Sequence, residues 1–565
     1  MDNAFSMKGI QAVKRPKRIN DSLITVFFAI AILFFSAFKA NAEQIEKKYL
    51  FSIPEDATSV HQKINDTGNA IAFWVRRPNG ISLLVSGFPP VEYKGHINFG
   101  PMNSFQAVTP SGKEDIYSAG ETAEKDVWLV WGPHEKLADY LSLDASGKHV
   151  AFAIYDHGKW RVVVDFKPEE PFNYVFPPML SADGGHYVYT AKKDDKFFVV
   201  KDGTPGKPYD EIFNDTLFIS DDGKHTFYVA KTDDQYNVVW GGKQVAVHEE
   251  MGQSEAFSPK GDRYAYSIAK NDTWHVVLDG KESAGYDGVA SFVFSPDGSH
   301  FAFRAKKNGK WKYVVDGKEG PAFDNTSSTL VFSKSGERFA YGAVNGEKWV
   351  AIENHKPGSE CDGLFGILFS EDGKHFAQGE FRGEKLQLVL DGKNKWEQTG
   401  EPAMRPVFSP DGLNLFYAIR KNSKIHLVVN GKESTPYDGV GMPVFSPDSQ
   451  HLVYLARRDK TELIVIDDSE MTSDYEAIPS YFDFTKWGQL VFWAIKDGKW
   501  VLTVNGEAGE AFDKGYLGSE APVSFSPDGS MTYFVLKDNE VYFVSHNPWL
   551  YRGYVKYLTD CKTNG

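Results

Sequence analysis

Apolar and polar residues alternate in short runs along most of the chain. Residues 300–304 read His-Phe-Ala-Phe-Arg, and residues 311–315 read Trp-Lys-Tyr-Val-Val. A period of two is typical of β-strands that bury one face. Polar turns separate the runs, and the period of an amphipathic helix is absent. The pattern therefore predicts an all-β protein.

The runs belong to an internal repeat, marked most clearly by Phe-Ser-Pro-Asp-Gly at 294–298, 408–412 and 525–529. Ser-Pro-Asp-Gly suits a type I turn, because proline fixes φ at its second position and glycine is favoured at the fourth. Degenerate copies extend the series to thirteen units of about 38 residues. Their last positions are 68, 112, 147, 184, 223, 261, 298, 336, 373, 412, 449, 488 and 529.

Each unit predicts four short antiparallel strands. The second alternating run often ends in Asp-Gly or Asn-Gly, as at 316–317 and 430–431, and these dipeptides favour a type I′ hairpin. The short segment that follows contains Pro321 or Pro436 in two units. Proline cannot donate a backbone hydrogen bond, so this segment should be an outer edge strand. Four such strands form one blade of a β-propeller.

Thirteen units exceed the four to eight blades of an ordinary propeller. The expected architecture is therefore tandem β-propellers, with about seven blades in residues 43–327 and about six in residues 328–565, which include a C-terminal tail. A six-plus-seven division and an open β-solenoid are the alternatives. Because a closed ring leaves no free sheet edge at its seam, the segment Lys47–Ser52 is expected to supply a closing strand.

The string Phe-Ser-Pro-Asp-Gly, followed two residues later by an apolar-Ala-aromatic segment, resembles the repeat of TolB-like β-propellers within the wider WD-repeat-like group. The resemblance covers nearly all of residues 60–547 and implies the fold, not the function. The Tol-system protein has an α/β domain before its propeller, whereas here the repeats begin soon after residue 43. The resemblance therefore indicates a TolB-like repeat protein other than the Tol-system protein itself.

Residues 1–42 have the pattern of a signal peptide. Lys14, Arg15, Lys17 and Arg18 precede the apolar run Leu23–Phe38, and Ala40-Asn41-Ala42 follows it. Cleavage before Glu43 predicts a periplasmic or secreted protein, and an uncleaved membrane anchor is the alternative. No later segment is apolar enough to span a bilayer.

Removing this segment takes away six Lys/Arg and two Asp/Glu, and the net charge falls from −14 to −18. Such a surface repels phosphate backbones, so nucleic acid is not an expected partner.

Histidine forms the most suggestive set of candidate ligands, because six units carry one two residues after the unit's last position. A ring of imidazoles could bind a metal or sense pH. These positions begin the second strand of each blade, so they diverge from the ring axis and cannot share one ion. We expect each imidazole to hydrogen-bond the Asp turn of its own blade, and we predict no metal or cofactor. The six are His149, His186, His225, His300, His375 and His451.

Other motifs and aromatic residues give weaker signals. His248-Glu249-Glu250 lacks the second histidine of a zincin, and residues 252–256 end in alanine where a nucleophile elbow needs glycine. Tryptophans at one repeat position, as at 160, 274, 311, 349 and 500, are expected in the core between blades. Aromatics that break the repeat are better candidates for ligand contact: Phe88, Tyr93, Phe99, Trp396, Trp549, Tyr551 and Tyr554.

The two cysteines, Cys361 and Cys561, form a possible disulfide. Cys361 occupies the position of the aromatic before Asp in other units, and Cys561 lies in the C-terminal tail. An exported compartment permits the bond. If the rings divide seven plus six, the bond would join the first and last blades of the second ring.

These features predict an exported, non-enzymatic scaffold that binds a protein or cell-envelope partner. The alternatives are an enzyme with its site in a propeller channel, such as a metal-dependent polysaccharide lyase or a glycoside-processing enzyme, and a passive glycan-binding protein. The sites of such enzymes gather residues from several blades and leave no linear motif, so the sequence alone leaves these alternatives open.

Overall fold

The computed structural model describes most of residues 45–546. Outside the description are residues 1–44, 54–56, 58, 65–70, 78–79, 87–90, 95–97, 100–104, 109–113, 116–117, 122–126, 132–140, 157–158, 473, 479–481, 487, 516–522, 526–529, 539 and 547–565. The predicted signal peptide therefore lies outside the described residues. The described residues contain strands and turns but no helix, which confirms the all-β prediction.

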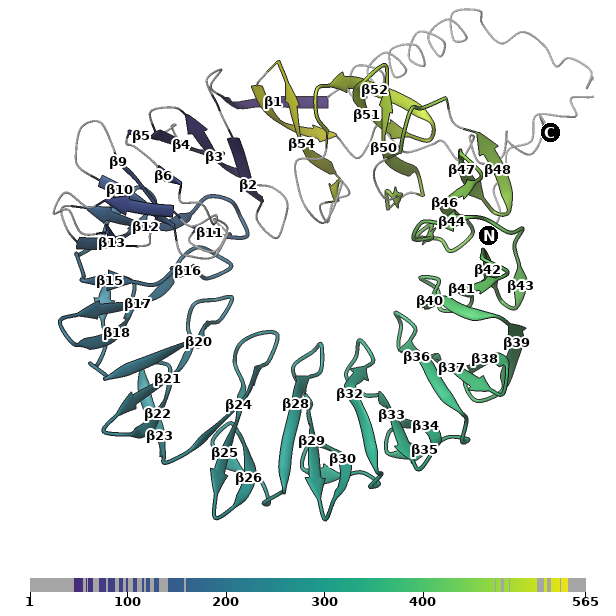
Figure 1. Cartoon of the computed structure of the whole chain (residues 1–565), viewed down its shortest axis with the longest axis horizontal. Coiled ribbons are helices and arrows are strands. Elements are labelled where there is room, and N and C mark those ends of the chain that lie inside the picture. The colour runs from purple at the N-terminus through teal and green to yellow at the C-terminus, as the bar shows by residue number, and fades with distance from the viewer. Residues whose placement is uncertain are drawn as a thin grey trace, which may run out of the picture.

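In the described residues, twelve antiparallel sheets of four or more strands stand side by side around a ring, each with its strands stepping outward from the opening (Figure 1). The innermost strands are β2 (Ser59–Ile64), β11 (Leu141–Leu143), β15 and β16 (Tyr174–Val175, Met179–Leu180), β20 (Glu211–Ile219), β24 (Met251–Phe257), β28 (Gly288–Phe294), β32 (Asn325–Phe332), β36 (Gly363–Phe369), β40 (Glu401–Phe408), β44 and β45 (Gly439–Val440, Val444–Phe445), β49 (Asp483–Phe484) and β53 (Ser524–Phe525).

The second strand of each sheet follows the Ser-Pro-Asp-Gly turn or its equivalent. These strands are β3 (Ile71–Arg77), β12 (Val150–Asp156), β17 (Tyr187–Lys193), β21 (Thr226–Thr232), β25 (Tyr264–Lys270), β29 (Phe301–Lys307), β33 (Phe339–Asn345), β37 (Phe376–Arg382), β41 (Leu415–Lys421), β46 (Leu452–Arg458), β50 (Leu490–Lys496) and β54 (Met531–Lys537).

The third strands form a hairpin with the second: β4 (Gly80–Val85), β13 (Lys159–Val164), β18 (Lys196–Lys201), β22 (Gln235–Trp240), β26 (Thr273–Leu278), β30 (Lys310–Val315), β34 (Lys348–Glu353), β38 (Lys385–Leu390), β42 (Lys424–Val429), β47 (Thr461–Ile466), β51 (Lys499–Val504) and β55 (Glu540–His546).

The outermost strands are mostly short. They are β5 (Val91–Lys94), β14 (Lys167–Pro168), β19 (Thr204–Pro205), β23 (Lys243–His248), β27 (Lys281–Glu282), β31 (Lys318–Glu319), β35 (Lys356–Pro357), β39 (Asn394–Thr399), β43 (Lys432–Glu433), β48 (Ser469–Thr472), β52 (Glu507–Phe512) and β1 (Ile45–Ser52). Between residues 98 and 131, β6 (Asn98–Phe99), β7 (Phe105–Val108) and β8 (Glu114–Asp115) form a small sheet, while β9 (Ser118–Glu121) and β10 (Val127–Trp131) join the sheet of β12.

The turns adopt the conformations that their sequences favour. Asp316 and Gly317 both have positive φ, 49° and 76°, as a type I′ hairpin requires. Gly298, at the end of a Phe-Ser-Pro-Asp-Gly string, has φ of 77°. The predicted four-stranded blade with an Asp-Gly hairpin is therefore confirmed.

The core lies between neighbouring blades, where the second strand of one packs on the third strand of the one before. One cluster joins Ala302, Tyr313 and Val315 to Tyr341 and Val350 of the next blade, all buried. The alternation of side chains along each strand produces this core, because each blade presents one apolar face to each of its two neighbouring blades.

The described chain forms one ring, and the expected division into two rings near residue 327 is wrong. The cluster just described crosses that boundary without interruption, and β28 contacts β32 as other neighbouring inner strands do. The expectation came from the usual number of blades and not from any residue at 327. The number of blades in a closed ring is set by the angle between neighbouring blades, and the repeat sequence alone does not give that number.

Closure takes place between the two ends of the chain. β1 pairs antiparallel with β55, from Ile45 opposite His546 to Ser52 opposite Glu540. β1 thereby becomes the outermost strand of the sheet formed by β53, β54 and β55. The expected closing role of Lys47–Ser52 is confirmed, at the seam of a single ring.

Candidate functional site

The serine of the repeated turn is buried and holds the turn in shape. Ser295 is fully buried and donates a hydrogen bond to Asp297 Oδ1 at 2.5 Å. The backbone N–H of His300 donates to Ser295 Oγ at 2.9 Å. Because a buried hydroxyl needs partners, the Ser-x-Asp pattern is a structural requirement of the blade, and the hydroxyl of Ser295 is not exposed as a nucleophile.

The histidine series is also structural in five of its six members. His300 Nδ1 lies 2.6 Å from Asp316 Oδ2, and Asp316 Oδ1 accepts a hydrogen bond from Phe301 N at 3.0 Å. This confirms the expected bond to the Asp turn of the same blade. The other pairs, at 2.7 or 2.8 Å, are His149–Asp165, His186–Asp202, His375–Asp391 and His451–Asp467.

His225 departs from the series because Gly241 stands where the other blades have Asp or Asn. Its ring stacks on Trp240 instead, with 5.1 Å between the ring centroids. The same repeat position also reaches the next blade. A Cβ on Gly223 would lie 2.3 Å from Cδ2 of His186 in the preceding blade, and Arg338 donates to the carbonyl of Gly373 at 2.7 Å. This position therefore fastens neighbouring blades together.

A second link between blades comes from the Asp that follows the aromatic of the outer segment. Asp324 pairs with Lys310 of its own blade, and its Oδ2 accepts from Gly346 N of the next blade at 2.7 Å. Hydrogen bonding from Lys310, followed by that from Gly346, lowers the pKa of Asp324. Equivalent Lys–Asp pairs are Lys196–Asp210, Lys348–Asp362, Lys424–Asp438 and Lys499–Asp513.

Most aromatic candidates are packed or lie outside the description. Trp160 is buried and Trp311 is half-buried, with the guanidinium carbon of Arg304 4.3 Å from the Trp311 ring centroid. Trp396 is half-buried and packs against the cluster of Leu386 and Leu388. The side chains of Tyr93 and Phe99 are not described, and Phe88, Trp549, Tyr551 and Tyr554 lie outside the described residues.

Cys361 is 2 % exposed, and Cys561 lies outside the described residues. The Cys361 Sγ donates to the Gly363 carbonyl at 3.2 Å, and burial, together with the charge of Glu380, raises its pKa to about 11. A thiol held protonated in this way is a poor nucleophile. The disulfide stays a prediction, although its argument from a second-ring seam no longer holds.

Strand β37 carries a buried polar group that sequence reasoning missed. Glu380 is 1 % exposed and accepts hydrogen bonds from Gln378 Nε2 at 2.5 Å and Arg382 Nε at 2.8 Å. The signal was present, since residues 376–382 read Phe-Ala-Gln-Gly-Glu-Phe-Arg, where residues 339–343 read Phe-Ala-Tyr-Gly-Ala. The carboxylate is neutralised by Arg382, so the group ties this blade together and does not offer a free charge.

The innermost strands supply a different kind of surface. In six consecutive blades, β20, β24, β28, β32, β36 and β40 leave regular pairing with their neighbours. The irregular residues lie six to nine positions before the end of the unit in each case, as at 214–217, 252–254 and 327–329. We call these residues the bulge belt. Bulges are frequent where a strand redirects side chains toward a functional site.

Hydroxyl groups stabilise the belt. Thr216 Oγ1 donates to Phe213 O at 2.6 Å and accepts from Val229 N at 2.9 Å. Ser327 Oγ donates to Thr329 O at 2.7 Å and accepts from Gly342 N at 3.1 Å. These side chains satisfy backbone groups that regular pairing would otherwise occupy, so the bulges are encoded by the sequence.

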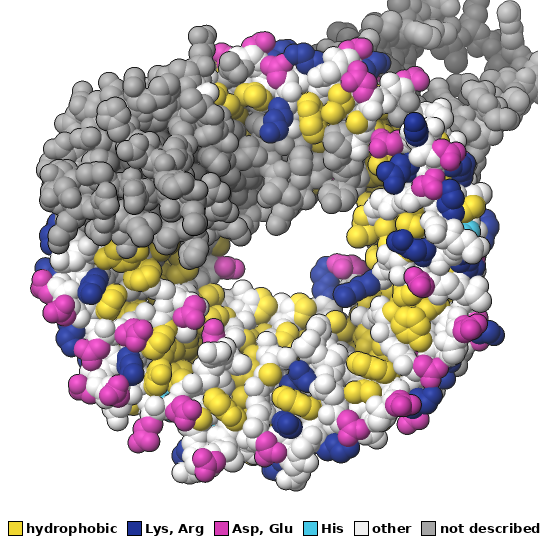
Figure 2. All heavy atoms as spheres, in the orientation of Figure 1, with side chains coloured by type: hydrophobic (Ala, Val, Ile, Leu, Met, Phe, Trp, Pro, Cys, Tyr) yellow, Lys and Arg dark blue, Asp and Glu magenta, His cyan; other side chains and the backbone are white. Residues whose placement is uncertain are grey.

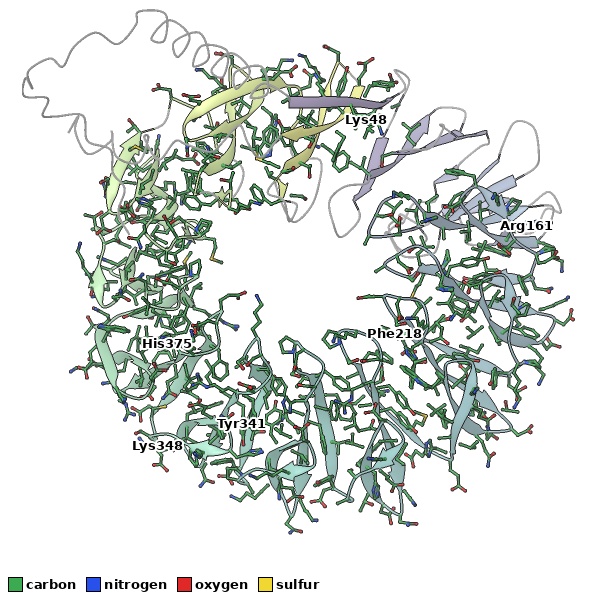
Figure 3. The ribbon with its side chains drawn as sticks, turned by 180° about the vertical axis from the view of Figure 1, so that it is seen from behind. Lys48, Arg161, Phe218, Tyr341, Lys348 and His375 are labelled. Atoms are coloured by element: carbon green, nitrogen blue, oxygen red, sulfur yellow. The ribbon has the colours of Figure 1, made fainter. Side chains whose placement is uncertain are left out.

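The belt borders a wide opening through the ring (Figure 2). Phe218 of β20 lies beside the opening and Lys348 of β34 lies on the outer side (Figure 3). Exposed polar side chains on the belt include Asp215, Gln253 and Ser328. This arrangement can bind a polar partner through hydrogen bonds and charge.

Groups of three or more His, Cys, Asp or Glu side chains placed to hold a metal ion are absent from the described part of the chain. The same residues include no helix long and apolar enough to cross a membrane.

Comparison with known proteins gives only distant likenesses among solved structures. No family model and no curated protein matches the chain. Among solved structures, the chain is similar to PorZ, an essential bacterial surface component of the type-IX secretion system of Porphyromonas gingivalis, with 8 % identity, a TM-score of 0.26, and 88 % of this chain and 86 % of that one covered.

It is also similar to TolB from Acinetobacter baumannii, with 13 % identity, a TM-score of 0.19 and coverage of 50 % and 75 % of the two chains. The Dos1 propeller matches with 11 % identity, a TM-score of 0.24 and coverage of 66 % and 93 %. These likenesses are too low to carry an argument about this chain. Its own sheets, set side by side around a ring, identify it as a multi-blade β-propeller protein.

Proposed function

We propose that this protein is an exported, non-enzymatic scaffold that binds a protein or cell-envelope partner at the bulge belt. The observation that carries the proposal is a contrast in how polar groups are used. The repeated Ser, His and Asp side chains are engaged in the contacts that build and join blades, as at Ser295, His300 and Asp324. The belt instead carries polar side chains that are exposed to solvent, such as Gln253 and Ser328.

Export is part of the proposal and rests on the leader pattern of residues 1–42. Fractionation of cells that express the full chain tests it directly. The mature protein should begin near Glu43 in the exported fraction, as read by N-terminal sequencing. Recovery of the intact Leu23–Phe38 segment in the membrane fraction would favour an anchored protein.

Partner binding is tested by photocrosslinking in the native cells. A crosslinking amino acid at Ser328, on the belt, should give a discrete adduct, and the same residue at Lys281, on outer strand β27, serves as the control. Adducts from Lys281 alone would place the partner elsewhere. Elemental analysis of the purified protein tests the alternative of a metal enzyme, which a stoichiometric transition metal would favour.

A further inference from the structure

The geometry points to a partner that is a protein with charges of both signs, presenting basic side chains to β20 and β24 and acidic side chains to β40. This inference rests on the proposed function and names the chemistry of its partner. The bulge belt carries charged side chains on two separate parts of its circumference. β20 and β24 lie across the opening from β40 (Figure 1), and these two parts have opposite charge.

The acidic wall consists of Asp215, a belt residue on β20, and Glu255, which directly follows the belt residues 252–254 on β24. Asp215 is exposed, Glu255 is half-buried, and within the described residues neither forms an ion pair. Burial, and then the nearby charge of Asp215, raise the pKa of Glu255. Two neighbouring carboxylates without a cation repel each other, so a basic group brought to this wall would be stabilised by both.

The bulge in β20 also contains an acceptor without a hydrogen-bond partner. Asn214 Oδ1, next to Asp215, is buried and has no hydrogen-bond partner in the structure. A buried acceptor without a donor is costly, and an N–H group of a bound chain would satisfy it. The ionised carboxylates of Asp215 and Glu255 only accept hydrogen bonds, which suits the ammonium and guanidinium groups of Lys and Arg.

The basic wall is formed by Arg405 on β40. Its side chain is exposed and has no ion pair in the described part of the chain. At the equivalent position, seven residues before the end of the unit, other blades carry Thr216, Ser254, Ser291 or Thr329. A single arginine where other blades have hydroxyl groups can bind a carboxylate with two parallel hydrogen bonds.

A protein partner fits these walls better than a glycan. A neutral glycan would leave Asp215, Glu255 and Arg405 without countercharges. The belt also lacks the exposed aromatic faces that stack on sugars. Its aromatic side chains, Phe292 and Phe365, are half-buried, and so are Phe213 and Phe218, which flank it in β20. A partner with both charges would be attracted by one wall and oriented by the other.

The test uses the full mature chain and three fluorescein-labelled peptides of equal length, built from alternating Lys-Ser, alternating Glu-Ser, and Gly-Ser. Anisotropy titrations compare wild type with Asp215→Asn/Glu255→Gln and with Arg405→Gln. Glu249→Gln and Lys281→Gln are the matched controls, because both residues are exposed away from the belt. Thermal midpoints confirm that each variant is folded.

We expect Asp215→Asn/Glu255→Gln to weaken binding of the Lys-Ser peptide about tenfold and Arg405→Gln to weaken binding of the Glu-Ser peptide about threefold. Each variant should leave the other charged peptide's affinity unchanged or improved. Binding should weaken as salt rises from about 20 to about 200 mM, and the Gly-Ser peptide should not bind.

Absence of binding by both charged peptides, or equal losses in the control variants, would overturn the two-wall inference. The photocrosslinking experiment separates this outcome from failure of the proposed function. Adducts at Ser328 without peptide binding would leave a scaffold whose partner is recognised by other chemistry, and binding of a neutral chitin oligosaccharide in place of the peptides would identify a glycan.

Discussion

At the residue scale, the repeated serine, histidine and aspartate positions, which were candidates for catalysis or metal binding, have a structural role. Ser295 closes the turn, and His300 joins the start of the second strand to the hairpin that ends the third. Asp316 accepts hydrogen bonds from both the imidazole and the backbone of Phe301. These contacts recur because the buried polar groups at the turns of each blade need hydrogen-bond partners.

Substituting His300 with alanine tests the structural role of the histidines. The variant loses the hydrogen bond to Asp316, whose donor is partly exposed, so the protein should be destabilised by about 1 kcal/mol. Urea unfolding followed by tryptophan fluorescence measures the change. Lys281→Ala, on an exposed outer strand, is the control, and loss of a stoichiometric metal on changing His300 would contradict the structural interpretation.

The ion pair of Glu470 with Arg458 should make a contribution to the free energy of unfolding that is lost at acid pH. Two hydrogen bonds from Arg458, both 2.6 Å, are the main reason that its pKa is lowered to about 2. Because the folded pKa is below the unfolded value of about 4.3, the contribution is present above about pH 4.3 and is lost as the pH falls toward 2.

Glu470→Gln should therefore lower the unfolding midpoint at neutral pH, and its difference from wild type should shrink between about pH 4.3 and 2. Thermal melts across this range measure the effect, with Glu462→Gln of the neighbouring strand as the control. A difference that stays constant down to pH 2 would show that the carboxylate's ionisation is not the cause.

At the scale of the element, Gly223 at the end of its turn meets two demands. Gly223 has φ of 65°, which disfavours other residues, and its missing Cβ leaves room for the ring of His186. The turn motif in the sequence indicates the positive φ. The close approach of His186 depends on the neighbouring blade and is seen only in the assembled ring.

A double substitution separates the two demands. Gly223→Ala should destabilise by about 1–2 kcal/mol from its positive φ alone, and by more because its Cβ would meet His186. In the His186→Gly background, which removes both the ring and the His186 Cβ that would lie 2.4 Å from the new Cβ, the same change should cost less, leaving the φ contribution. Equilibrium unfolding of the four proteins measures the coupling, and purely additive effects would mean that the imidazole moves aside freely.

Strand β37 shows where local pattern reasoning was incomplete. Its period-two alternation predicts a strand, and the strand is present. Residues 376–380 are all buried, so alternation alone does not explain a glutamate at 380. Its tolerance there depends on Gln378 and Arg382 on the same face. A buried charge is acceptable only when its partners are in place.

At the scale of the whole molecule, closure depends on one strand from the far end of the chain. β1 is held by its pairing with β55 and by contacts such as Lys47–Glu510 at 3.1 Å and Tyr49 edge-on to Tyr542. The seam therefore joins residues about 500 positions apart, so the entropy of closing a very long loop opposes it.

Removing β1 should open the ring at this seam. A chain that starts after Ile53 should show a larger radius of gyration in small-angle scattering and faster amide exchange in β54 and β55, because β55 becomes an exposed edge. A chain that starts at Glu43 retains β1 and is the matched control. Equal exchange in the two chains would show that side-chain packing alone closes the ring.

The possible bond between Cys361 and Cys561 is tested by thiol titration of the denatured, unreduced protein. One disulfide leaves no free thiol. Because burial protects Cys361 in the folded state, the denatured protein gives the decisive number, and a reduced sample is the control. Two free thiols per chain would contradict the bond.

The sequence by itself determined the blade. Strand alternation, the Ser-Pro-Asp-Gly turn and the Asp-Gly hairpin are local, and the structure has them where the pattern places them, as at β29, β30 and Gly317. Local signals are sufficient here because dihedral preference and the burial of alternate side chains act within a few residues.

Only the tertiary structure decided how the blades assemble. One ring in place of two, the contact between His186 and Gly223, and the charged walls of Asp215 and Arg405 all depend on residues brought together from different blades. A repeat pattern is nearly identical in each unit, so it fixes how a blade packs on its neighbour but not how many blades meet before the ends join. That number depends on the small angle between blades, summed around the ring.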